Sequence, residues 1–168
     1  MTVKNQLEKL EFHDSFLKAI NVVFSPKPSC ILNIDYYNWE MVNKTLASQS
    51  TAKGKIVAID SEYKQLVIKF DFLAHIEYSE PDLINSIGSI TCITLDYGLD
   101  RFEKEYAAVK QRFPLCKYPI LEEGAETISI KFDTHSNGYV WIVGSGVSME
   151  WVESVTPQEG SQLNDNLS

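Results

Sequence analysis

The side chains most suited to chemistry are three histidines and several aspartates. His13 is followed by Asp14 and Ser15, the three residue types of a serine-hydrolase triad. Such triads are assembled from distant segments of a fold, so three neighbours in sequence do not predict one. Asp14 and Ser15 also suit a turn, because their short side chains bond nearby backbone groups. A local turn or cap is therefore the interpretation favoured by the sequence.

The histidines could also meet across the fold, beside carboxylates, in a pocket or at a metal. His75 and His135 each follow a copy of Ile-Lys-Phe-Asp, by four and by two residues. Histidines four residues apart and Cys-x-x-Cys, the usual zinc-ligand spacings, are both absent from the sequence. We therefore expect no metal and no cofactor. A ligand-binding or hydrolytic pocket remains the alternative, and its residues would be His13, Asp14, His75 and His135.

Four aspartates occupy similar places in runs that alternate apolar and polar residues. If these strands adjoin, the carboxylates line one face or rim of a sheet, where they attract a cation or a basic partner. The other interpretation is an ordinary solvated sheet face. The four residues are Asp35, Asp71, Asp96 and Asp133.

Charge is distributed unevenly along the chain. The net charge is −8, and all of it arises in residues 80–168, because basic and acidic residues balance in 1–79. Such a half lacks the basic patch of a nucleic-acid-binding protein. It permits a basic protein partner, although solubility and an acidic tail explain it equally. The acids expected to bind such a partner are Glu122, Glu123, Glu126, Asp133, Glu150 and Glu153.

Length and composition are typical of one soluble domain. A chain of 168 residues with 44% hydrophobic content is long enough to bury a stable core without disulfide bonds or bound metals. No apolar run is long enough to span a membrane, and the N-terminus lacks a signal core. Three widely spaced cysteines fit a reducing cytoplasm. We expect a single cytoplasmic α+β domain over 1–155 and a polar tail over 156–168.

A long hairpin over 126–151 organises the predicted fold. Asn137-Gly138 suits a type I′ turn, because both central positions need positive φ. That turn places Ser136 opposite Tyr139 and fixes the register. Gly144-Ser145-Gly146 is expected to be a bulge or flexed point. One face of the hairpin then collects Ile128, Ile130, Phe132, Tyr139, Trp141, Val143 and Val147.

The same register places Val140 and Ile142 on the opposite face, beside Asp133 and His135. A partly apolar face must be covered by something. A helix over 99–113 could cover it. A second copy of the chain could cover it as well, so a homodimer is an alternative.

The remaining pattern predicts a largely antiparallel sheet with helices packed on one face. Residues 89–97 are apolar or β-branched on both faces, which places that strand centrally. The other expected strands are 17–24, 30–37, 55–60, 65–72 with an extended continuation over 74–78, and 118–121. The expected helices are 3–10, 38–50, 79–87 and 99–113.

A recurring strand pattern suggests an internal duplication. The runs at Leu32 and Ile93 are similar, and so are those at Ile68 and Ile130, which gives offsets of 61 and 62 residues. A duplicated strand–helix–strand–strand unit would produce both offsets. Chance similarity is the alternative, because alternating strands with an outward aspartate are common.

The segment Phe12-His13-Asp14-Ser15-Phe16-Leu17, leading into strands at 20–22 and 31–35, resembles the opening of a set of small bacterial β-rich domains. Some of these domains are grouped with the immunity proteins of polymorphic toxin systems. The resemblance covers about the first quarter of the chain. It implies a protein that acts by binding a toxin, with no catalytic residues to carry over. With the acidic half, it predicts a non-enzymatic binding protein with a basic, toxin-like partner.

Overall fold

The computed structural model describes residues 2–24, 27–49, 63–79, 89–112, 124–135 and 138–152. These residues form one six-stranded antiparallel sheet with strand order β1-β2-β3-β6-β5-β4, and three helices. The strands are β1 (Phe16–Val23), β2 (Ser29–Tyr37), β3 (Tyr63–Tyr78), β4 (Ile90–Leu95), β5 (Ile128–Thr134) and β6 (Tyr139–Val152). The helices are α1 (Val3–Leu7), α2 (Trp39–Gln49) and α3 (Leu99–Arg112). The α+β class and the antiparallel sheet are thus confirmed.

Strand alternation explains the first hairpin. The even-numbered residues from Cys30 to Tyr36 are buried, and the odd-numbered ones between them are partly exposed. β1 and β2 pair antiparallel as predicted, with Val22 opposite Cys30. This alternation gives the hairpin one core face and one outer face.

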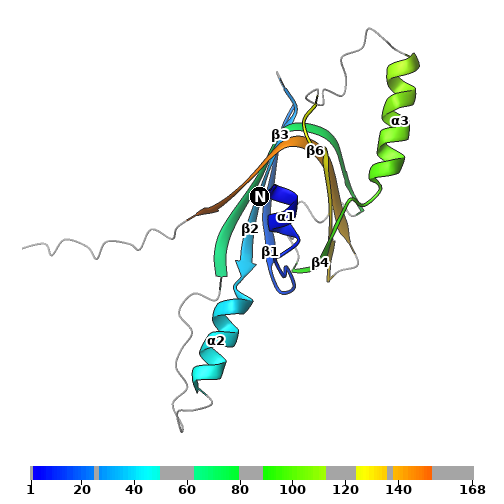
Figure 1. Ribbon diagram of the computed structural model, residues 1–168. Coiled ribbons are helices and arrows are strands. Elements are labelled where there is room, and N and C mark those ends of the chain that lie inside the picture. Colours follow the sequence, from blue (N-terminus) through cyan, green and yellow to red (C-terminus); the bar gives the residue numbers. More distant parts are fainter. Residues whose placement is uncertain are drawn as a thin grey trace, which may run out of the picture.

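The long strands β3 and β6 pair along most of their length and bend sharply together (Figure 1). A Cβ on Gly144 would lie 2.4 Å from the Phe72 carbonyl oxygen, and Gly146 has φ of +62°. Only glycine permits both this close approach and this backbone conformation at low cost. A register shift in β3 between Leu73 and His75 lies opposite the bend. The expected flexed point at Gly144-Ser145-Gly146 is confirmed.

The expected register of the 126–151 hairpin is wrong by three residues. Phe132 pairs with Val140, and Asp133 pairs with Tyr139, so the connection is longer than a two-residue turn. Thr134 N donates to the Gly138 carbonyl (2.9 Å) across that connection. An odd shift moves Tyr139, Trp141 and Val143 to the other face of the sheet, whereas Val147 still packs against the main core.

The true register divides the apolar residues of β6 between two clusters. Val140 and Ile142 join Phe132 in the main core. Trp141 and Val143 lie on the outer face of the sheet, where they are buried against α3. Trp141 therefore lies on the opposite side of the sheet from Phe132, contrary to expectation. The indole Nε1 of Trp141 donates to the buried Ser129 Oγ (2.8 Å), which satisfies its polar atom in that position.

β4 lies at one end of the strand order and not at its centre, so this expectation is also wrong. Its start meets β1 through a bridge between Ser89 and Phe16. Ile90 N donates to the Ser15 carbonyl (2.7 Å) at the same place. The sheet thus curls until its two ends touch, and this junction, formed by Ser15, Phe16, Ser89 and Ile90, is called the seam below. Curling of this kind protects edges that a flat sheet would expose.

The helices do not share one face of the sheet. α1 lies on the inner side of the curl (Figure 1), where Leu7 is part of the main core. α3 lies on the outer side, where Phe102 packs with Trp141. No helix in the described part of the chain is long and apolar enough to cross a membrane.

Several expectations concern residues outside the described ranges. These are the strands at 55–60 and 118–121, the helix at 79–87 and the tail at 156–168. Duplication also stays a prediction. The offsets of 61 and 62 would place Ile93 opposite Ile130 because Leu32 is opposite Ile68, but Ile93 pairs with Phe132.

Candidate metal centre

Three of the predicted pocket residues meet beside the seam. His13 and Asp14 lie in the turn before β1, and His135 directly follows β5. His135 N donates to the Ser89 carbonyl (3.1 Å), which ties the end of β5 to the start of β4. The curl of the sheet thus brings together side chains that are more than a hundred residues apart in sequence.

The backbone around His13 is held firmly. Ser15 N donates to the Phe12 carbonyl (3.0 Å), closing a turn in which Asp14 has φ of 65°. Aspartate tolerates this left-handed conformation better than most residues. Trp39 Nε1 donates to the His13 carbonyl (3.0 Å) and anchors the turn to α2. The predicted local role of Asp14 in a turn is therefore confirmed.

Ser15 has a structural role in the part of the chain that the structure describes. Its side chain is fully buried, and Tyr37 N donates to its hydroxyl oxygen (3.0 Å). This contact joins the start of β1 to the end of β2. The geometry gives no support to a triad of His13, Asp14 and Ser15.

The imidazoles of His13 and His135 and the carboxylate of Asp14 form a compact set of ligand atoms. One such atom from each residue lies within 4.8 Å of the others. His13 Nδ1 is 2.9 Å from Asp14 Oδ2, and the two imidazole centroids are 6.1 Å apart at 74°. Two imidazoles and a carboxylate are a ligand set that zinc and other first-row transition metals accept.

An open hollow of about 370 Å³ borders this cluster. Its lining is mostly polar and consists of Thr91, Asp133, Thr134, His135 and Gly138. Lys131 Nζ is 2.6 Å from Asp133 Oδ1, and Cys92 Sγ donates to Asp133 Oδ2 (3.4 Å). The hollow gives solvent or a small ligand access to His135.

His75 does not join the cluster, so the four-residue pocket is only partly assembled. It packs against Trp141, with centroids 4.4 Å apart, on the outer side under α3. Its Nε2 lies 3.5 Å from Glu77 Oε2. Glu77 also accepts a hydrogen bond from the Tyr139 hydroxyl, which lowers the pKa of Glu77 and raises the pKa of Tyr139.

The four strand aspartates each have a lysine partner. The pairs are Lys18–Asp35, Lys69–Asp71, Lys4–Asp96 and Lys131–Asp133. A carboxylate with its own lysine does not need a shared cation. This arrangement supports the interpretation of a solvated, ion-paired surface.

The acidic set expected to bind a partner is described only in part. Glu126 and Glu150 are exposed, and Asp133 pairs with Lys131. Glu122, Glu123 and Glu153 lie outside the described residues. The acidic interface therefore stays a prediction.

Three of the four residues of the predicted pocket meet, and the sequence did not indicate which three. The signal available in the sequence was the position of the two histidines: His13 precedes the first strand, and His135 directly follows a later one.

Comparison with family models, curated proteins and solved structures found no match to this chain. The resemblance of its opening segment to immunity proteins consequently also stays a prediction.

Proposed function

We propose that this chain is a binding protein that holds a divalent transition metal through His13, Asp14 and His135. The observation that carries this proposal is the convergence of their ligand atoms within 4.8 Å. The ligands come from two segments that meet at the seam. A metal bound there would fasten the start of β1 to the end of β5.

The ligand chemistry selects the class of metal. Zinc lies about 2.0–2.2 Å from imidazole nitrogen and carboxylate oxygen, so its ligand atoms are about 3–4 Å from one another. His13 and Asp14 already have a pair of atoms at 2.9 Å. Movements of about 1 Å at the exposed His13 and His135 side chains would bring ligand atoms that now lie within 4.8 Å of one another to that separation. Calcium and magnesium prefer oxygen ligands and fit this site poorly.

Three protein ligands leave coordination positions for water or a small molecule. The polar hollow shares His135 with the proposed site and would give such a ligand a way in. The proposed site departs from the expectation of no metal, and it uses three of the four residues of the pocket that the sequence suggested. Its proposed role is metal binding, with His75 excluded.

The test is stoichiometric binding of Zn²⁺ and Co²⁺ to purified, chelator-treated protein. We expect one ion per chain by calorimetry, and cobalt absorption bands typical of nitrogen and oxygen ligands. His13→Ala and His135→Ala should each weaken binding at least tenfold. His75→Ala is the matched control, since it removes the third histidine of the chain, and it should bind like wild type.

Two results would contradict the metal proposal. One is the absence of saturable binding to a protein whose circular dichroism shows it folded. The other is equal weakening by all three histidine substitutions, which would indicate nonspecific surface binding.

We also propose, as a second function, binding of a basic protein partner. The acidic half of the chain, the exposed Glu126 and Glu150 and the opening motif support it. A partner captured from the native host should be released by moderate salt, because exposed charges are screened. Glu150→Lys should weaken capture and Glu150→Gln should do so less; capture unaffected by either charge change would count against an acidic interface.

A further inference from the structure

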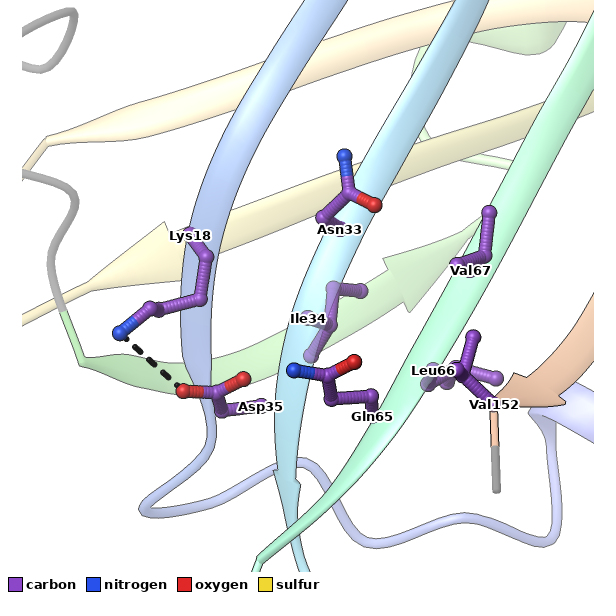
Figure 2. A pocket seen from close by; sticks show the side chains of 8 residues that line it. All are labelled: Lys18, Asn33, Ile34, Asp35, Gln65, Leu66, Val67 and Val152. Carbon is purple, nitrogen blue, oxygen red and sulfur yellow. Dashed lines mark ion pairs between the residues drawn. The ribbon is translucent and has the colours of Figure 1, made fainter. Parts of the chain in front are cut away.

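The outer face of β1, β2 and β3 carries a second hollow, which is separate from the metal centre. Figure 2 shows it from close by, with side chains from three neighbouring strands and Val152 at the end of β6. Its volume is about 140 Å³. Its lining consists of Lys18, Asn33, Asp35, Gln65, Val67 and Val152, together with Ile34 and Leu66 of the core strands.

This hollow combines apolar and polar side chains and is electrically balanced. Lys18 Nζ lies 3.2 Å from Asp35 Oδ2, drawn as a dashed line in Figure 2. These two are the charged side chains among the described residues that line it. Asn33 and Gln65 add two amides on the same face, each with donors and an acceptor. Such a surface suits a neutral ligand that has both apolar faces and hydrogen-bonding groups.

Three aromatic rings continue this face toward the end of the strands. Phe16 pairs with Asp35 and therefore shares its side of the sheet. Tyr37 pairs with Tyr63, and these residues lie two positions from Asp35 and Gln65 on the same side. The Tyr63 ring lies 5.7 Å from that of Phe16 and 5.3 Å from that of Tyr37. Phe16 is 37% and Tyr63 is 38% exposed.

We infer that this face, from the Phe16–Tyr37–Tyr63 rings to the Asn33–Gln65 amides, binds a neutral saccharide. A sugar ring has apolar C–H faces that lie on aromatic rings and hydroxyl edges that bond amides and carboxylates. The Tyr37 and Tyr63 rings and the Gln65 amide are neighbours along the same pair of strands.

Other occupants fit this face less well. A nucleic acid or a phosphorylated ligand requires net positive charge, and Lys18 is neutralised by Asp35. A peptide added as a strand pairs with a strand edge, whereas the hollow lies on the sheet face across β1, β2 and β3. The saccharide does not depend on the proposed metal, because these side chains do not include His13, Asp14 or His135.

The test is a titration of the ¹⁵N-labelled full chain with cellobiose, maltose and N-acetylglucosamine, in the presence of EDTA. We expect saturable shifts at Asn33 and Gln65 for at least one sugar, with millimolar affinity. Tyr63→Ala and Gln65→Ala should each weaken binding at least tenfold. Tyr78→Ala is the matched control, because it removes an exposed tyrosine at the other end of β3, and it should leave binding unchanged.

Three outcomes would overturn the inference. They are no saturable shift with any of the three sugars, equal weakening by Tyr63→Ala and Tyr78→Ala, and shifts at this face that follow protein concentration without sugar. The last would show that a second copy of the chain covers the face. EDTA keeps this result independent of the metal proposal.

Discussion

The contact between Tyr139 and Glu77 shows how single residues respond to pH in this fold. The tyrosine hydroxyl donates to the carboxylate, which lowers the pKa of Glu77 and raises that of Tyr139. A carboxylate with a lowered folded pKa stabilises the protein above its ordinary pKa and loses this effect as the pH falls through the folded value. A tyrosine with a raised pKa loses its effect as the pH rises through its own folded value.

Tyr139→Phe should therefore lower the free energy of unfolding by a small amount near neutral pH. The difference from wild type should shrink as the pH falls from the ordinary glutamate pKa through the lowered pKa of folded Glu77, because the carboxylate is then protonated in both states. It should shrink again above about pH 10, where unfolded Tyr139 ionises. Urea unfolding at pH 3, 7 and 10.5 measures this, and a difference that stays constant across that range would argue against the contact.

The two described cysteines differ in accessibility. Cys30 is fully buried, and its burial raises the pKa of its thiol to about 11. Cys92 is exposed, although desolvation and Asp133 also raise the pKa of its thiol. Reaction requires both access and thiolate.

In a Cys116→Ser background, Cys92 should react with a thiol reagent at pH 8 at least about ten times faster than Cys30. Mass spectrometry of peptides after timed quenching measures both rates. The Cys92→Ser variant should leave one slowly reacting thiol, and rapid labelling of Cys30 in it would show that β2 opens readily.

At the level of elements, the bend in β3 and β6 determines the shape of the sheet. Because of this bend, the β3–β6 pair forms part of the curled sheet and also provides the outer face on which α3 packs. Because Gly144 lies against the Phe72 carbonyl, the approach of the two backbones depends on the missing side chain.

Gly144→Ala should lower the free energy of unfolding by about 1–3 kcal/mol, the usual cost of overpacking. Gly124→Ala is the control, because its Cβ would meet nothing within 4 Å. In Gly124→Ala the expected cost is that of the left-handed backbone conformation alone, about 1 kcal/mol. Chemical denaturation compares the two, and equal losses would mean that the close approach at Gly144 does not limit stability.

At the level of the whole molecule, the seam joins the two ends of the curled sheet with few contacts. A ligand that binds the folded chain alone stabilises it by mass action, by about 2.7 kcal/mol at a concentration 100 times its Kd. The proposed metal bridges this seam. Metal binding should therefore raise the free energy of unfolding of the whole chain.

Saturating Zn²⁺ should raise the Tm by about 5–10 °C, from that free energy and the usual shift per kcal/mol in a chain of this size. Differential scanning calorimetry with and without EDTA measures the shift. His135→Ala should abolish it and His75→Ala should retain it. A Tm shift that persists in His135→Ala would place the metal elsewhere.

Local pattern was sufficient to predict most of the elements. The 17–24 and 30–37 hairpin, the helices at 38–50 and 99–113 and the flexed point near Gly144 depend on periodicity, on cap residues and on glycine. These signals act over a few residues, so they survive without knowledge of the rest of the fold. The sequence also indicated the side chains of the candidate site, but it did not separate His13, Asp14 and His135, which meet, from His75, which does not.

Tertiary structure decided how those elements meet. A hairpin register depends on which of two apolar faces is better buried, and an odd shift placed Trp141 under α3 instead of beside Phe132. The curl that brings β4 to β1 sums small twists and one sharp bend over the whole sheet. For this reason the meeting of His13 and His135, and the exclusion of His75, could not be derived from local sequence.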